Sequence, residues 1–141
     1  MGGVGRAVGR GIKTYGQDVL SKEQLVTCLR TEANANATAD QIDAAAEKLA
    51  ALKQKLEEFS SVIDKQAQLV DHYSQLSVNN YNGLVERHRQ MVAEYNAMLP
   101  SYNSLIDSNN ALARSFNASC SSKSYYDDDM QAARLVVSQT P

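Results

Sequence analysis

The chain contains no tryptophan and only two phenylalanines, and its aromatic fraction is 6%. Bulky aromatic side chains supply much of the apolar area of a globular core, so a large core is not expected. Proline occurs only at Pro100 and Pro141, and Gly83 is the only glycine after Gly16. Because glycine and proline are the main helix breakers, their scarcity predicts a largely helical chain beyond residue 17.

Signals of several other protein classes are also absent. No apolar run reaches the length of about 18 residues that a membrane-spanning helix needs. The residues after Met1 lack the apolar segment of a signal peptide, which predicts either a cytosolic protein or a mature form whose leader was replaced by Met1. No phosphate-binding loop, GxSxG or HExxH motif occurs, so we expect no enzymatic activity, no cofactor and no small-molecule substrate.

A metal site is not expected, because the chain has no CxxC pair and its two histidines, His72 and His88, are far from both cysteines. The acidic run Asp127–Asp129 is interpreted as the cap of a following helix rather than as a calcium site.

The net charge of −2 is unevenly distributed. Residues 1–30 carry five basic and two acidic residues, whereas the remainder carries nine basic and fourteen acidic ones. This small basic excess, without interleaved aromatic residues, does not predict nucleic-acid binding.

A heptad repeat is the strongest positive signal. Six consecutive heptads run from Tyr81 to Ser122, with Tyr, His, Asn or Phe at position one and mostly apolar residues at positions four and five. A second apolar column begins at Ile42 and also recurs every seven residues, through Leu49, Leu56 and Ile63. Such repeats keep one stripe of each helix facing a partner, so both regions are predicted to form a coiled coil.

The phase of the repeat shifts between the two columns, around the segment SVNNYNG at residues 77–83. Asparagine and glycine tolerate turn conformations, so we expect the chain to reverse there. The alternative is a stutter in one uninterrupted helix. The predicted fold is all-α: a long antiparallel helical hairpin of residues 38–77 and 83–119, within a hairpin region of residues 38–122, with short flanking helices.

The flanks divide into three segments. Residues 1–17 form a glycine-rich basic arm, which we expect to be flexible. Residues 18–37 form a short helix, capped by Ser21 and Gln24, and a linker around residues 34–39, with a second capping pair at Thr38 and Gln41. Residues 123–141 form a short C-terminal helix and a tail.

Two cysteines occur, Cys28 and Cys120. A turn at residues 77–83 places Cys120 opposite residues 38–40, and the linker lets the preceding short helix fold back so that Cys28 comes within reach. We therefore predict a Cys28–Cys120 disulfide and an oxidising compartment. Two unrelated buried thiols in a cytoplasmic protein are the alternative.

The glycine-rich start, the heptads headed by Tyr-Asn, the flanking cysteines and the motif YYDDDMQAAR at residues 125–134 together resemble uncharacterised exported bacterial coiled-coil proteins with paired cysteines. The resemblance covers most of residues 19–135. It implies an extracytoplasmic location in the periplasm, the envelope or the medium, and it implies no particular activity.

The expected function is that of a structural or interaction protein, a coiled-coil spacer or assembly subunit of an exported or envelope complex, with a protein partner or self-association. The alternative is a membrane-surface or envelope binding module that uses the N-terminal arm. The interaction seam is predicted at Leu49, Leu52, Leu56, Phe59, Ile63, Tyr95, Leu99, Tyr102, Leu105 and Phe116. The arm contact is predicted at Gly5, Arg6, Gly9, Arg10 and Lys13.

Overall fold

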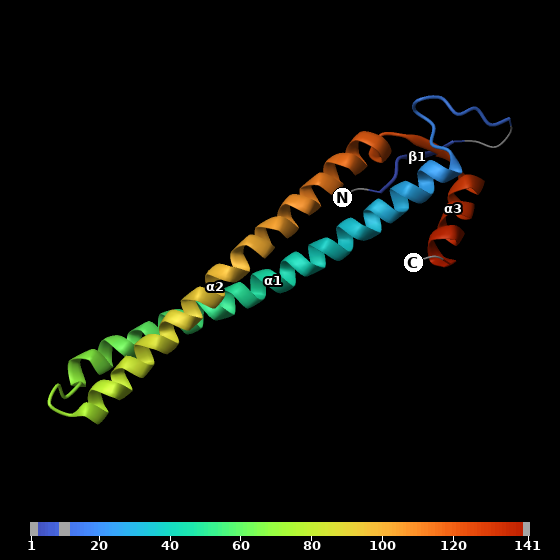
Figure 1. Ribbon diagram of the computed structural model, residues 1–141. Coiled ribbons are helices and arrows are strands. Elements are labelled where there is room, and N and C mark those ends of the chain that lie inside the picture. Colours follow the sequence, from blue (N-terminus) through green and yellow to red (C-terminus); the bar gives the residue numbers. More distant parts are fainter. Residues whose placement is uncertain (1–2, 9–11, 140–141) are drawn as a thin grey trace. The chain divides into compact units, whose positions relative to one another are not determined.

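The computed structural model describes residues 3–8 and 12–139. Helices α1 and α2 pack antiparallel to each other, which confirms the predicted all-α helical hairpin (Figure 1). The elements follow the order β1 (Arg6–Val8), α1 (Lys22–Leu69), α2 (Gln75–Phe116), the π-helix η1 (Asn117–Ser121), β2 (Ser124–Tyr126) and α3 (Asp127–Gln139).

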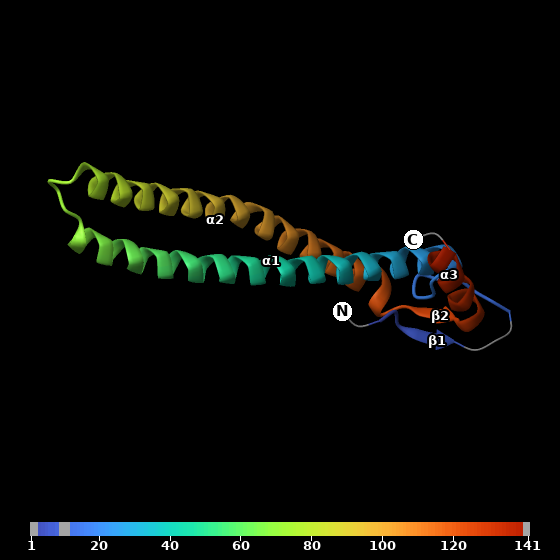
Figure 2. The same cartoon turned by 90° about the horizontal axis from the view of Figure 1, so that it is seen from below.

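The chain forms two compact units. The base unit comprises Met1–Gln41 and Leu105–Pro141, and the turn unit comprises Ile42–Ser104. Each unit contains one stretch of α1 and one stretch of α2 running side by side (Figure 2).

Helix α1 begins at the predicted capping box. The Ser21 backbone N–H donates to Gln24 Oε1 at 2.8 Å, and the Gln24 N–H donates to Ser21 Oγ at 3.2 Å. The predicted linker at residues 34–39 is wrong, because α1 continues through it without a break. Ala35 is buried there, seven residues from both Cys28 and Ile42, so the apolar stripe of the helix continues through a segment rich in asparagine.

The predicted capping pair of Thr38 and Gln41 is also wrong. The Thr38 hydroxyl donates to the Asn34 carbonyl at 2.8 Å, one turn earlier within the same helix. Threonine in a helix often bonds in this way, so its presence did not mark a new N-terminus.

The chain reverses as predicted, but at residues 70–74 rather than at residues 77–83. Asp71 Oδ1 accepts the Tyr73 N–H at 3.0 Å, and Ser74 Oγ accepts the Ser77 N–H at 3.2 Å, which caps the start of α2. An aspartate and a serine therefore form the turn, and the asparagines of residues 79–82 lie inside α2.

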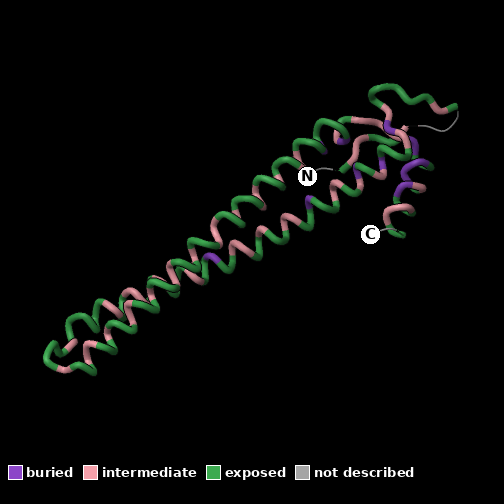
Figure 3. The backbone as a smooth tube through the Cα atoms, in the orientation of Figure 1, coloured by how far each residue is buried: buried purple, intermediate pink, exposed green. Residues whose placement is uncertain are grey.

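The buried face of α2 follows the predicted heptads. From Tyr81 to Phe116, every residue at positions one, four and five is at least partly shielded from solvent, and every other residue is exposed. Pro100 lies inside the helix on its exposed side. Most of the fully buried positions lie in the base unit, as Figure 3 shows in purple.

The base unit contains a small parallel sheet that the sequence did not predict. Strand β1 pairs with β2 in a register that places Arg6 opposite Ser124, and Val19 bridges Ser124 as well. The Arg6 N–H donates to the Lys123 carbonyl at 3.1 Å. A Cβ added to Gly5 would lie 1.8 Å from that carbonyl oxygen, so only glycine fits there.

The core of the base unit joins α1, the end of α2 and α3. Helix α3 is the short C-terminal helix predicted from the sequence, and it buries Met130 and Ala133. Asp127–Asp129 occupy its first turn, where carboxylates oppose the positive end of the helix dipole. The buried cluster consists of Leu20, Leu25, Cys28, Phe116, Cys120, Met130 and Ala133.

Candidate interaction surfaces

A disulfide between Cys28 and Cys120 closes the base unit, as predicted. The two Cα atoms are 6.0 Å apart, and 92 residues separate them in sequence. Both side chains are almost completely buried. The geometry differs from the predicted one: Cys28 lies on α1 itself, and with the turn at residues 70–74 the two cysteines face each other directly across the hairpin, so no short helix folds back.

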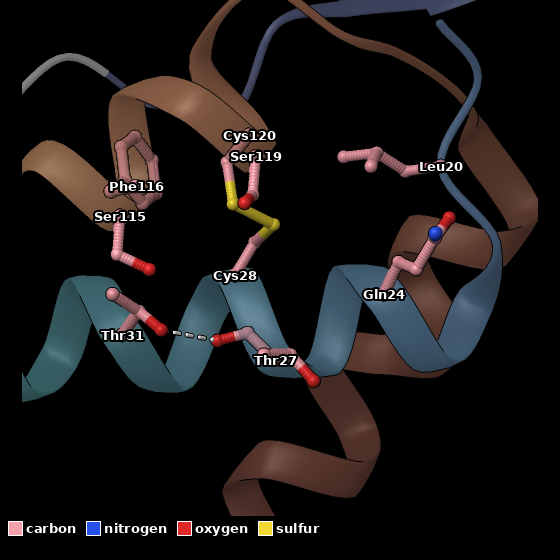
Figure 4. Close-up of a pocket in the computed structure, with 9 residues that line it drawn as sticks. All are labelled: Leu20, Gln24, Thr27, Cys28, Thr31, Ser115, Phe116, Ser119 and Cys120. Carbon is pink, nitrogen blue, oxygen red and sulfur yellow. Dashed lines mark hydrogen bonds between the residues drawn. A yellow bond between two sulfur atoms is a disulfide. The ribbon is translucent and has the colours of Figure 1, made fainter. Parts of the chain in front are cut away.

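A cavity of about 260 Å³ adjoins the disulfide (Figure 4). Two threonine hydroxyls at its wall are used within α1: Thr31 donates to the Thr27 carbonyl at 2.9 Å, and Thr27 donates to the Glu23 carbonyl at 3.2 Å. None of the residues around the cavity is an acid, a base or a histidine. The lining residues are Leu20, Gln24, Thr27, Cys28, Thr31, Ser115, Phe116, Ser119 and Cys120.

The N-terminal arm is fastened to α3 by a cluster of polar side chains. Lys13 Nζ forms ion pairs with Asp128 Oδ2 at 2.5 Å and with Asp129 Oδ1 at 2.9 Å. The Tyr15 hydroxyl donates to Asp129 Oδ2 at 2.5 Å. Both carboxylate oxygens of the buried Asp129 are therefore satisfied by the arm.

Tyr126 of β2 completes this attachment. Its hydroxyl accepts the Thr14 N–H at 2.8 Å and donates to the Thr14 carbonyl at 3.3 Å. Its ring meets the Tyr15 ring edge to face, with the centroids 5.7 Å apart, and Lys13 Nζ lies 5.8 Å from its centre. The YYDDD motif thus binds the chain's own N-terminal segment.

The charges in this cluster shift each other's pKa values. The hydrogen bond from Tyr15 and the ion pair with Lys13 lower the pKa of Asp129, and Lys13 lowers the pKa of Asp128. The two carboxylates raise the pKa of Lys13, and the bond to Asp129 raises the pKa of the Tyr15 phenol. Every shift favours the protonation state in which these contacts form.

Three of the five predicted arm-contact residues lie in described parts of the chain. Gly5 and Arg6 belong to the strand pairing with the β2 region, and Lys13 binds α3. Gly9 and Arg10 lie outside the described residues. The prediction of a flexible arm is wrong for residues 6–8, which pair with β2, and for residues 13–15, which bind Tyr126 and Asp129.

The predicted seam faces inward along both helices. Leu49 and Phe116 are buried, and the remaining seam residues are partly shielded, with none in the exposed class. Leu105 and Phe116 belong to the base unit, and the other eight lie in the turn unit. Within Ile42–Ser104, which the structure describes without a gap, Leu49 alone is buried. Two helices therefore cover the stripe of the turn unit only in part.

An open groove lies along this partly covered stripe. Phe59 stacks on His88 with 6.1 Å between the ring centroids, and the Arg87 guanidinium lies 5.9 Å from the Phe59 ring centre. Val62 remains 45% exposed beside them. The groove has a volume of about 340 Å³ and is lined by Lys55, Glu58, Phe59, Val62, Arg87 and Met91.

Asn109 occupies a heptad position that holds a tyrosine in most of the other repeats. It is partly buried, and its Oδ1 accepts no hydrogen bond from the described residues. A polar group at such a position lowers stability, and it is the kind of residue that fixes helix register in coiled coils.

Residues 3–8 and 12–139 contain no cluster of three or more His, Cys, Asp or Glu side chains able to hold a metal ion. Within the same ranges, no helix is both long enough and apolar enough to span a bilayer.

Comparison with protein-family profiles, with curated proteins and with solved structures finds no match to this chain.

Proposed function

We propose that the protein is a non-enzymatic coiled-coil spacer or assembly subunit of an exported or envelope complex. The observation that carries this proposal is the incomplete burial of the heptad stripe in the turn unit. The eight seam residues there are all at least partly shielded from solvent, yet Leu49 alone is buried. A third helix, from another copy or from a partner, would remove the remaining apolar area from water, which is favourable at about 25 cal/mol per Å².

The disulfide supports the exported part of the proposal. Stable disulfides are characteristic of oxidising compartments, and the buried Cys28–Cys120 pair is compatible with such a location. Mass measurement of the protein recovered from its native cells, with thiols trapped at lysis, tests this part. A fully reduced pair would contradict export.

Sedimentation velocity over a wide concentration range tests assembly. The wild-type chain is expected to associate as its concentration rises. Val62→Lys and Arg87→Glu, made separately, change exposed side chains of the groove and are expected to shift the equilibrium towards the monomer.

Ala51→Lys is the matched control, because it adds the same charge at an exposed position of α1 outside the groove. It is expected to associate as the wild type does. A chain that stays monomeric at millimolar concentration, with the three variants indistinguishable from it, would contradict self-assembly through the groove.

Membrane binding through the N-terminal arm has less support. The ammonium group of Lys13 is already paired with two carboxylates of α3, so it is less available for anionic lipids. Arm-mediated binding requires anionic vesicles, weakens with salt and disappears when residues 1–17 are deleted.

A further inference from the structure

The turn between α1 and α2 exposes three large apolar side chains. Tyr73 is 100% exposed, Leu69 is 73% exposed and Leu76 is 71% exposed. They lie within eight residues of one another, in the segment that closes the hairpin in Figures 1 and 2. We call Leu69–Leu76 the apolar turn. Single exposed apolar residues are ordinary, whereas several exposed apolar residues in one short segment are typical of interaction sites.

Charge is almost absent around the apolar turn. Residues 66–85 contain no lysine, arginine or glutamate, and they include one aspartate, Asp71, and one histidine, His72. Charged residues make up 21% of the chain, so about four would be expected in a segment of this length. Gln, Asn and Ser supply most of its polarity instead. Because a charged group costs much free energy when it leaves water, a surface with few charges enters a less polar environment more easily.

Three backbone N–H groups of the apolar turn, those of Asp71, Tyr73 and Ser74, are hydrogen-bonded locally. The Asp71 N–H donates to Ser77 Oγ at 2.9 Å, and the Ser74 N–H donates to the Asp71 carbonyl at 3.0 Å. Together with the bonds that cap α2, they satisfy donors that would otherwise need water. Polar backbone groups that are already paired cost less to move into a lipid interface.

The area of the apolar turn argues against a second copy as its occupant. One tyrosine and two leucines present roughly 400–500 Å² of surface. Two such turns would bury less than about 1,000 Å² in total, below the ~1,200 Å² at which specific protein interfaces begin. A bilayer surface needs no matching shape, and it surrounds an inserted tip on all sides.

We propose that the apolar turn is a lipid-contact site that enters the interfacial layer of a zwitterionic phospholipid bilayer. Tyr73, in the turn itself, and Leu69 and Leu76, on the helix ends that flank it, enter the boundary between headgroups and acyl chains, where amphipathic aromatic rings concentrate. With almost no basic residues present, binding requires no anionic lipid and changes little with salt.

The absence of tryptophan allows a direct test. Tyr73→Trp places a single fluorophore at the fully exposed position of the full-length, disulfide-bonded protein. Adding phosphatidylcholine vesicles is expected to shift its emission to shorter wavelength, equally at low and high sodium chloride. Leu135→Trp is the matched control, because Leu135 is 62% exposed on α3, and its emission is expected to stay unchanged.

Leu69→Ser with Leu76→Ser, combined with Tyr73→Trp, tests the two leucines. Both residues are exposed, so the hairpin is expected to fold as before, which circular dichroism checks. Vesicle partitioning is expected to weaken by at least about tenfold, because each leucine contributes on the order of a tenfold step.

Three results would overturn the proposal. The first is an emission of Tyr73→Trp that phosphatidylcholine leaves unchanged. The second is a shift that depends on protein concentration without vesicles, which would assign the apolar turn to a second copy. The third is binding that needs anionic lipid and is lost on deletion of residues 1–17, which would assign lipid binding to the arm. Assembly through the groove is measured without lipid, so its failure is distinguishable from these outcomes.

Discussion

Removal of the Cys28–Cys120 bond is expected to be the most destabilising change that leaves the rest of the chain intact. The bond joins residues 92 apart, and closing a loop of that length lowers the entropy of the unfolded chain by an amount worth about 4–5 kcal/mol. Small domains have a total free energy of unfolding of about 5–15 kcal/mol. The disulfide therefore accounts for a large part of the stability of a hairpin whose described residues form one small buried cluster.

Urea unfolding followed by circular dichroism measures this contribution. The double substitution Cys28→Ala and Cys120→Ala is compared with the oxidised wild type and with wild type reduced in denaturant and refolded under a phosphine reductant. At a slope of ~2 kcal/mol per M, the midpoint is expected to fall by about 2 M in both the variant and the reduced protein.

The alanine variant also provides the control, because the reductant has no disulfide to act on and should leave its midpoint unchanged. Equal urea midpoints for the oxidised and the reduced wild type would refute the reasoning. The remaining contacts of the base unit would then account for the whole free energy of unfolding. An intact mass showing two chains joined by disulfides would refute it as well, because the link would not close a loop within one chain.

Three further predictions concern the arm and α2. Gly5→Ala places a Cβ 1.8 Å from a backbone oxygen and is expected to abolish the slow amide exchange of β1, whereas Gly3→Ala has open space around it and should leave that exchange unchanged. Asp129→Asn is expected to free the arm at neutral pH, whereas Asp127→Asn is not. In the wild type, folding lowers the pKa of Asp129. The stabilisation of the attached arm by the Asp129 carboxylate is therefore complete above the ordinary aspartate pKa of about 4, and it is lost as the pH falls through the lower pKa of the folded protein. Amide exchange of the arm measures both the effect of Asp129→Asn and this pH dependence. Pro100→Ala is expected to raise the free energy of unfolding by about 1–3 kcal/mol, because it restores a helical N–H on an exposed face, and Pro100→Gly should gain about 1 kcal/mol less; urea unfolding compares the three proteins.

The buried face of α2 was predictable because a heptad repeat is a local geometric property. A residue seven positions further along a supercoiled helix returns to the same side, whatever the rest of the chain does. Tyr81, Tyr95 and Tyr102 all lie on the shielded side for this reason. The same argument, extended backwards from Ile42, would have included Ala35 and Cys28 and shown that α1 has no linker.

Composition was the misleading signal. The asparagines at residues 34–36 and 79–82 indicated a linker and a turn, yet both segments are helical. Asparagine is only a mild helix breaker, and a continuous apolar stripe outweighs it. The actual turn is specified by Asp71 and Ser74, whose side chains bond to backbone N–H groups a few residues later. Such capping pairs are short and common in sequences, so they indicate a turn only where the apolar column of the helix also ends.

The attachment of the arm was not predictable from local sequence. Lys13 and Asp129 are 116 residues apart, and nothing in a glycine-rich segment specifies which carboxylate it will meet. Gly5 belongs to a different contact of the arm, the pairing of β1 with the β2 region, and the need for glycine there depends on the position of the Lys123 carbonyl. Contacts of this kind depend on the base unit already being formed.

The disulfide was predicted correctly from a turn that was misplaced, and the physical reason concerns helix register. In a heptad hairpin, moving the turn changes which residues meet across the seam but leaves the same stripe facing inward, so the burial pattern is compatible with several registers. Cys28 lies seven residues before Ala35 in the same apolar column, so Cys28 faces the seam in each of these registers. The Cys28–Cys120 bond is compatible with the register in which the turn lies at residues 70–74. Registers that move Cys28 away from Cys120 across the hairpin are incompatible with this covalent bond.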